Sequence, residues 1–256
     1  MKTIDLWIAG LDAWVIALTF AVSMIAFFLL GTRRGRLSPA PPGDSGEKFT
    51  DASMALLGLL LAFTFSMALN RYDDRRQAMV AETNAIGDLY TTATLLPEPT
   101  RSEFQTLLRN YATQRLEGRR QRALRNTPEH VTAAARQMQA TATEIVARMV
   151  DERTPVTVPL VNTLNNLTST YAAYLAAYRE RLPVIVLIML FLGSAIPSFL
   201  MGRQGATNMV HKSGPLAFGL LVTLVIYVTF DLNQPSGGLI TIADEPLVEL
   251  LKSMAK

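Results

Sequence analysis

Four long stretches with almost no charged residues constrain this chain more than any other feature of its sequence. They cover residues 13–30, 52–69, 183–201 and 215–230. A stretch of about 18 or more apolar residues can cross a bilayer, whereas the core helices of soluble proteins are usually shorter and interrupted by polar faces. The pattern therefore predicts four transmembrane helices, and it excludes a soluble globular enzyme as a description of the whole chain.

The first apolar stretch is predicted to be a retained membrane helix. A cleaved secretory signal carries its positive charge before the apolar region. Here Arg33, Arg34 and Arg36 follow the stretch and only Lys2 precedes it. This charge order favours a transmembrane helix over a signal peptide.

The region between the second and third spans is predicted to be a helical soluble layer. Residues 71–96 contain no proline, so the second span is expected to continue out of the membrane until Pro97 stops it. Helical spacing of apolar residues continues in 100–125, and 127–151 begins with a Thr-Pro start signal. No segment alternates with the period of a strand.

The predicted fold is therefore an all-α membrane protein, with four transmembrane helices and a helical soluble layer inserted between spans two and three. The expected organisation is residues 1–70 for the first two spans, 71–181 for the layer, 182–232 for the last two spans and 233–256 for a C-terminal tail. Basic residues near the span ends are almost evenly divided between the two sides, so charge alone does not predict the orientation.

Several kinds of chemistry are excluded by composition. The chain has no cysteine, which rules out disulfides, thiolate metal sites and cysteine nucleophiles, and its two histidines are isolated in the sequence. No nucleophile elbow, phosphate loop or calcium-loop motif occurs. A net charge of +3 is too small to indicate nucleic-acid binding. We expect no catalytic residue, no metal, no cofactor and no nucleic-acid partner.

A charged cluster lies where the second span leaves the membrane. It reads Asn-Arg-Tyr-Asp-Asp-Arg-Arg over residues 70–76. Such residues anchor helix ends by extending to the membrane surface. If several copies of the helix surround an axis, the same residues form charged rings at a pore mouth. The candidate mouth residues are Asn70, Arg71, Asp73, Asp74 and Arg75.

An apolar stripe lies within the second span. Leu59, Phe63 and Met67 share one helix face at four-residue spacing, and Ser66 lies on the neighbouring face. A stripe of this kind usually meets lipid or another helix. Repeated around an axis, it forms a constriction that gates by dewetting. These four residues are the candidate pore neck.

The most basic stretch lies in the soluble layer. It has a single acidic residue, Glu117, among the arginines Arg109, Arg115, Arg119, Arg120, Arg122 and Arg125. The ordinary interpretation is a solvated helix face. An anion vestibule or a contact with acidic lipid head groups are the functional alternatives.

These motifs resemble a known family. Residues 70–76, followed by Glu-Thr-Asn at 82–84, resemble the exit of the pore helix in bacterial bestrophins. Residues 231–237 are similar to their acidic-x-x-Pro-Phe-Gly element, with Asp231, Pro235 and Gly237 as the C-terminal motif, and Glu-Pro-Leu at 245–247 is similar to their Asp-Leu-Pro-Leu element. The chain looks closer still to bestrophin-like bacterial membrane proteins, which share Leu-Leu-Pro-Glu-Pro as at 95–99.

The resemblance implies a homo-oligomer, expected to be a pentamer, in a bacterial plasma membrane. It also implies that span two lines the axis and that the helical layer and the termini are cytosolic. The neck would fall at Leu59, Phe63 and Met67, or one residue earlier at Gly58, Ala62 and Ser66. The implied partners are other copies of the chain, the lipid bilayer and small inorganic ions.

Some family features are replaced. Arg75 and Arg76 stand near the paired aromatics of the bestrophin pattern, and Ser236 stands in place of the phenylalanine. Residues 237–240, Gly-Gly-Leu-Ile, replace the acidic run that forms the calcium clasp of animal bestrophins, which argues against calcium gating.

Two functions are consistent with these features. The leading hypothesis is a bestrophin-like ion channel, in which the arginine excess slightly favours anions while Asp73 and Asp74 favour cations. The alternative is a non-conducting scaffold or sensor whose helical layer binds a partner.

Overall fold

The computed structural model describes residues 12–37, 45–123, 129–151, 155–205, 213–234 and 238–255, and the described residues contain helices and no strand. The helices are α2 (Ala13–Leu37), α3 (Ser45–Ala93), α4 (Thr100–Ala123), α5 (Glu129–Asp151), α6 (Thr157–Arg179), α7 (Val184–Gln204), α8 (Ser213–Asn233) and α9 (Glu245–Met254).

Four helical segments are long and apolar enough to cross a membrane. They are Ala13–Leu37, Lys48–Ala93, Thr157–Gln204 and Gly214–Asn233. The prediction of a four-span, all-α membrane protein is confirmed. The helices of the predicted layer also begin and end close to the expected residues, because Pro97 and Pro99 separate α3 from α4.

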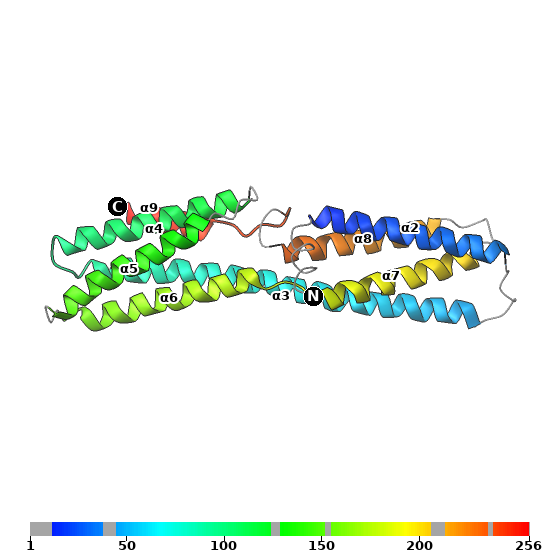
Figure 1. Cartoon of the computed structure of the whole chain (residues 1–256), viewed down its shortest axis with the longest axis horizontal. Coiled ribbons are helices and arrows are strands. Elements are labelled where there is room, and N and C mark those ends of the chain that lie inside the picture. The colour runs from blue at the N-terminus through cyan, green and yellow to red at the C-terminus, as the bar shows by residue number, and fades with distance from the viewer. Residues whose placement is uncertain are drawn as a thin grey trace. The chain divides into compact units, whose positions relative to one another are not determined.

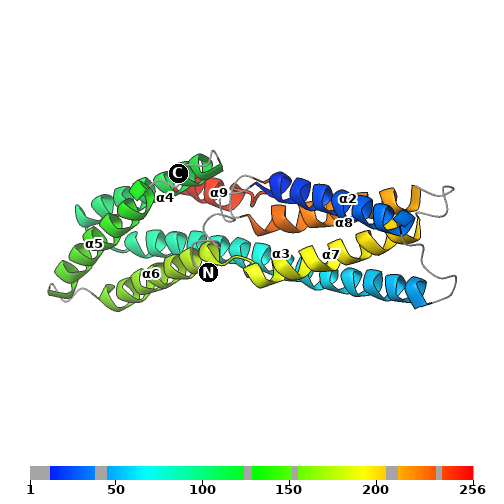
Figure 2. The same ribbon diagram turned by 45° about the vertical axis from the view of Figure 1, so that its right-hand side comes forward.

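The described residues form two compact units. The first contains those within 1–72, 181–234 and 238–240, and the second those within 73–180 and 241–256. In the first unit α2, α7 and α8 lie side by side (Figure 1). In the second, α4 packs against α5 and α9, and α5 packs against α6 (Figure 2).

Small residues allow α2 and α7 to pack at backbone contact. A Cβ atom added to Gly31 would overlap the carbonyl oxygen of Phe199, and one added to Gly202 would overlap that of Phe28. Other buried small residues of the two helices are Ala13, Ala17 and Gly35 of α2 and Ser194, Ala195 and Ser198 of α7. Helices in lipid gain little from burying apolar surface, so they associate through close van der Waals contact of this kind.

The second unit has a core of large apolar side chains drawn from five helices. Ile86 and Leu89 of α3 lie in it with Phe104 of α4, Ile145 of α5 and Leu167 of α6, all at most 1% exposed. The fifth helix, α9, is amphipathic and adds two further side chains from residues 245–254 to this core, Leu247 and Met254. The predicted C-terminal tail thus contains a packed helix.

The backbone contact between α2 and α7 makes a stability prediction. We expect Gly202→Ala to lower the free energy of unfolding by about 1–3 kcal/mol or more, because the added methyl group must push two backbones apart. Thermal unfolding of the full chain in detergent micelles, followed by circular dichroism, measures the effect.

Gly58→Ala is the matched control for this prediction. Among the described residues, nothing lies within 4 Å of a Cβ atom added at Gly58. Alanine there should be neutral, or stabilising by up to about 1 kcal/mol through its higher helix propensity. Equal effects of the two substitutions would contradict the backbone contact.

Candidate functional site

Helix α3 buries one face within the first unit. Leu57, Leu61, Thr64 and Ala68 are at most 8% exposed. A Cβ atom added to Gly193 of α7 would lie 3.5 Å from Cδ1 of Leu57, so α7 packs against this face. The spacing of the buried positions leaves the opposite face of α3 turned outward.

All four candidate neck residues lie on the outward part of α3. Phe63 is 65% exposed, Leu59 53% and Met67 38%, and Ser66 is exposed as well. The alternative register is equally exposed at Gly58 and Ala62. A single chain thus leaves this apolar face available for lipid or for another copy, and the neck assignment stays a prediction.

The candidate mouth residues separate onto different faces of α3. Asn70 and Asp74 are exposed, and Arg71 and Asp73 are half-buried. Arg75 is only 1% exposed. It follows Ala68 by seven residues, which places it on the packed face of the helix. Asn70 therefore continues the outward face, whereas Arg75 does not.

Asp231 of the C-terminal motif binds the backbone of the segment that begins at Gly238. Its carboxylate accepts backbone N–H hydrogen bonds from Leu239, at 3.0 Å, and Ile240, at 2.8 Å. A Cβ atom at Gly238 would lie 2.6 Å from Oδ1 of Asp231, so a side chain there would displace the carboxylate. The aspartate is 2% exposed and acts as a structural cap. Pro235 and Gly237 lie outside the described residues.

Asn233 forms a second contact at the end of α8. Its Oδ1 accepts the backbone N–H of Leu182 at 3.2 Å. This hydrogen bond holds the start of the third span against the end of the fourth. The sequence offers no signal for it, because the two residues are 51 positions apart.

A buried ionic network lies in the second unit. Arg115 of α4 binds Glu82 of α3 through two hydrogen bonds, from Nε to Oε1 at 2.7 Å and from Nη2 to Oε2 at 2.5 Å. The hydroxyl of Tyr111 donates to the same Oε1 at 3.0 Å. The guanidinium carbon lies 4.6 Å from the ring centre of Tyr174 and 5.2 Å from that of Tyr171. Bidentate hydrogen bonding and ring contact both match the planar guanidinium.

Burial fixes the protonation states in this network. The side chains of Arg115 and Glu82 are 3% and 5% exposed. Burial opposes the charged form of Arg115, but the Glu82 carboxylate outweighs it and raises the pKa of the guanidinium. Burial, reinforced by the same carboxylate, raises the pKa of the Tyr111 hydroxyl. Arg115 is thus held charged and Tyr111 is held neutral.

Two further arginines hold the C-terminal segment. Arg119 binds Oδ1 of Asp244 through Nε at 2.6 Å and the carbonyl oxygen of Ile242 through Nη2 at 3.2 Å. Arg109 donates to the carbonyl oxygen of Met254, which also accepts the hydroxyl of Tyr90 at 3.1 Å. These contacts attach 242–254 to α3 and α4.

The interpretation of the arginine stretch as a solvated face or an anion vestibule is therefore wrong for Arg115 and Arg119. Their side chains are 3% and 7% exposed. The carboxylates that bind them come from positions 33 and 125 residues away, so no pattern within α4 reveals them. Arg120 is exposed. The side chains of Arg122 and Arg125 lie outside the described residues.

No metal-binding group stands out in the ranges that the structure describes. Within them, no three histidine, aspartate or glutamate side chains come together in a way that could hold an ion. The arrangement contains an outward helix face in the first unit and an internally neutralised charge network in the second.

One comparison with known proteins identifies a family. A family model described as a Bestrophin-like domain matches residues 17–247. No curated protein and no solved structure gives a significant match to the chain.

Removing the carboxylate of the buried pair should be costly. We expect Glu82→Gln to lower the free energy of unfolding by about 3–5 kcal/mol, because it leaves the Arg115 charge buried without its counter-ion. The exposed pair of Arg148 and Glu103, 3.3 Å apart, provides the control. There Glu103→Gln should cost less than about 1 kcal/mol. Similar losses in both variants would contradict the importance of the buried pair.

The buried tyrosine predicts a loss of stability in alkali. The pKa of Tyr111 is raised above its ordinary value of 10.0. Above that pH the unfolded chain loses the proton while the folded chain keeps it, so the free energy of unfolding falls as pH rises. Tyr111→Phe should lower the free energy of unfolding by about 1–2 kcal/mol at neutral pH. Above pH 10, the free energy of unfolding of this variant should fall less steeply with pH than that of the wild type.

Unfolding curves of the wild type and the Tyr111→Phe variant from neutral pH into alkali measure this contribution. Loss of stability with the same slope in both proteins would show that Tyr111 does not contribute to the alkaline transition.

Proposed function

Because the chain belongs to the bestrophin-like family, we propose that it is an oligomeric membrane channel that passes small ions through a pore lined by α3. The observation that carries the proposal is the outward face of α3. Within a membrane-spanning segment, the first unit leaves Leu59 and Phe63 more than half exposed, at 53% and 65%. Other copies of the same helix would cover this face.

The pore would use two kinds of ring on α3. Large apolar side chains, Leu59, Phe63 and Met67, would narrow the axis and gate it by dewetting. Ser66 and Asn70 would add polar rings that replace part of the hydration of an ion. The mouth would be set by Asp74, which is exposed, and by the half-buried Arg71 and Asp73.

The ion preference of the proposed pore depends on the charged side chains that are not neutralised inside the protein. Arg115 and Arg119 are neutralised by Glu82 and Asp244, so they contribute little to a field that attracts anions. At the mouth, Arg71 and the exposed Arg76 favour anions, whereas Asp73 and the exposed Asp74 favour cations. We propose a slight preference for anions because the whole chain carries a net charge of +3.

The assembly and its location follow from the resemblance to bestrophins. We place five copies around the axis, in a bacterial plasma membrane, with cytosolic termini and a cytosolic second unit. The basic charges divide too evenly between the two sides to favour the opposite orientation.

A second candidate function is a non-conducting scaffold or sensor. It is favoured by a cavity of about 610 Å³ in the second unit, between α5 and α6. Gln139, Thr143, Asn165 and Thr168 line it beside Val146 and Leu164. A mixed polar and apolar surface of this kind suits a protein partner.

Single-channel recording of the purified protein in planar bilayers tests the proposal. We expect unitary currents whose conductance rises roughly twofold or more in Phe63→Ala, because the constriction widens. Arg71→Ala should shift the reversal potential in a salt gradient toward cation selectivity. Ile188→Ala is the matched control, because Ile188 is an exposed apolar residue of α7, at 49%.

The result that would overturn the channel proposal is silence in every ionic condition from an oligomer shown to be intact. Currents that change equally in the Phe63 and Ile188 variants would remove α3 from the pore. Silence would favour the scaffold and direct attention to the cavity between α5 and α6.

A further inference from the structure

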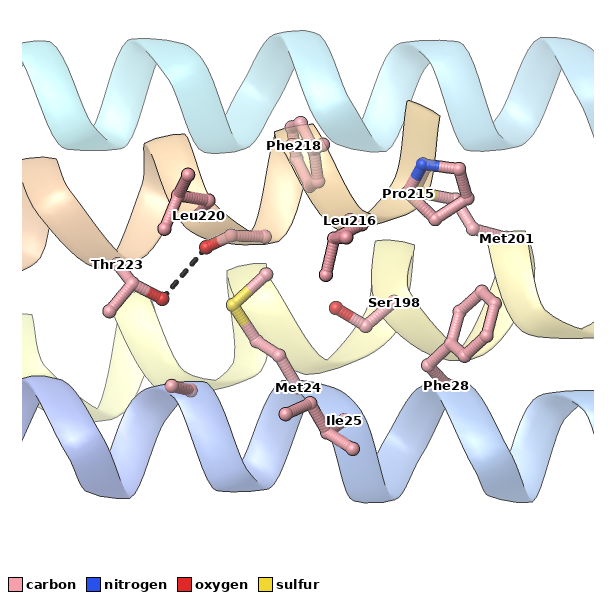
Figure 3. A pocket seen from close by; sticks show the side chains of 12 residues that line it. Met24, Ile25, Phe28, Ser198, Met201, Pro215, Leu216, Phe218, Leu220 and Thr223 are labelled. Carbon is pink, nitrogen blue, oxygen red and sulfur yellow. Dashed lines mark hydrogen bonds between the residues drawn. The ribbon is translucent and has the colours of Figure 1, made fainter. Parts of the chain in front are cut away.

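An apolar groove lies between α2, α7 and α8 of the first unit (Figure 3). Its volume is about 520 Å³. Met24 and Ser198, which are 5% and 4% exposed, form the floor. Ile25 of α2 and Leu216 and Leu220 of α8 form the rims and are 58–76% exposed. The groove is therefore open along its length on the membrane-facing side of the three helices.

The groove offers almost nothing to a polar ligand. Its two hydroxyl groups belong to Ser198 and Thr223. Ser198 donates to the carbonyl oxygen of Ser194 at 2.7 Å. Thr223 donates to that of Gly219 at 2.7 Å (Figure 3). Both protons are thus used within their own helices. The remaining lining is hydrocarbon, thioether and aromatic, which suits an alkyl chain.

The length of the groove matches part of one leaflet. Its lining runs from Ala21 to Phe28 on α2 and from Pro215 to Thr223 on α8. At 1.5 Å per helical residue, these stretches are about 10–12 Å long. One leaflet contributes about half of the roughly 30 Å hydrocarbon core, so the groove covers most of its depth.

Basic side chains gather at one end of the groove. Helices α2 and α7 run in the same direction, since Gly31 packs against Phe199 and Phe20 packs against Phe191. Their C-terminal ends therefore lie together, next to the end of the groove that Phe28 and Met201 line.

Four arginines lie at this basic end, just beyond the groove. Arg33, Arg34 and Arg36 are exposed there. Arg203 is half-buried, and among the described residues its Nε has no hydrogen-bond acceptor.

We propose that this groove binds one acyl chain of an anionic phospholipid, with the phosphate held by Arg33, Arg34 and Arg203. An acyl chain gains little free energy by leaving other acyl chains for the groove, so its contribution is shape complementarity. The arginines would select lipids with an anionic head group. The apolar lining and the basic end thus recognise two parts of one molecule. The site does not depend on ion conduction, because no α3 residue takes part.

Photo-crosslinking of the full chain in vesicles tests the acyl-chain part. Phosphatidylcholine vesicles would contain a trace of phosphatidylglycerol with a diazirine in its acyl chain, and labelled peptides would be mapped by mass spectrometry. We expect labels in residues 21–28 and 215–223. Gly219→Leu and Ala21→Leu, which fill the groove, should each lower this labelling roughly threefold or more.

Ala217→Leu is the matched control for the filled groove. Ala217 is exposed on the same helix and does not line the groove. Its labelling should equal that of the wild type, and all variants should keep the helical circular dichroism and elution volume of the wild type. Wild-type labelling in either filled variant would overturn the acyl-chain site. Absence of labels from α2 and α8 would overturn it too, and would favour another copy of the chain in the groove.

A second arm tests the head group. The same diazirine chain carried on phosphatidylcholine should label the groove roughly threefold less than on phosphatidylglycerol, because it lacks net negative charge. Combined Arg33→Gln, Arg34→Gln and Arg203→Gln substitutions should abolish that difference. Arg179→Gln is the matched control, because Arg179 is exposed and precedes the N-terminal end of α7 in the sequence. This substitution should preserve the difference between the two lipids. Equal labelling by the two lipids in the wild type would overturn the role of the arginines.

Discussion

The packing of the first unit depends on the backbone contact between α2 and α7 at Gly31 and Gly202. In a bilayer, apolar side chains gain nothing by leaving lipid for protein, so the hydrophobic effect cannot hold these helices together. Close approach of two backbones substitutes for it, and only glycine allows that approach at these two positions. The two helices run in the same direction. Their C-terminal arginines therefore share one end of the first unit, and α2 and α7 form the groove together with α8.

The second unit is held by a different kind of packing. Large apolar side chains such as Ile86, Phe104 and Leu167 form its core, in place of a backbone contact between small residues. Glu82 and Arg115 are placed inside this core, where each charge is acceptable only because the other is present. Such a pair specifies which faces of α3 and α4 meet. It also removes Arg115 from the charges that an ion would encounter, so the basic composition of the layer overstates its attraction for anions.

Helix α3 belongs to both environments, and its two faces have different roles. Leu57, Leu61 and Ala68 bind it to its own chain, while Leu59 and Phe63 have no comparable cover within the described residues. An apolar face without a partner in a single chain is ordinary for a lipid-facing helix. In the channel that we propose, other copies would bring this face together around an axis. The outward face of α3 and the groove between α2, α7 and α8 are separate surfaces.

The sequence by itself determined the helical class, the four spans and the ends of most helices, because these depend on local hydropathy and on proline. Pro97 and Pro99 stop α3 wherever the rest of the chain lies. Its motifs also resembled the correct family, since they are contiguous. Only the tertiary structure decided that Arg115 and Arg119 are paired inside, that Asp231 binds the backbone of Leu239 and Ile240, and that Arg75 lies on the packed face of α3. Each of these outcomes depends on a partner far along the chain or on which helix face meets a neighbour, and hydropathy and helical spacing carry no information about either.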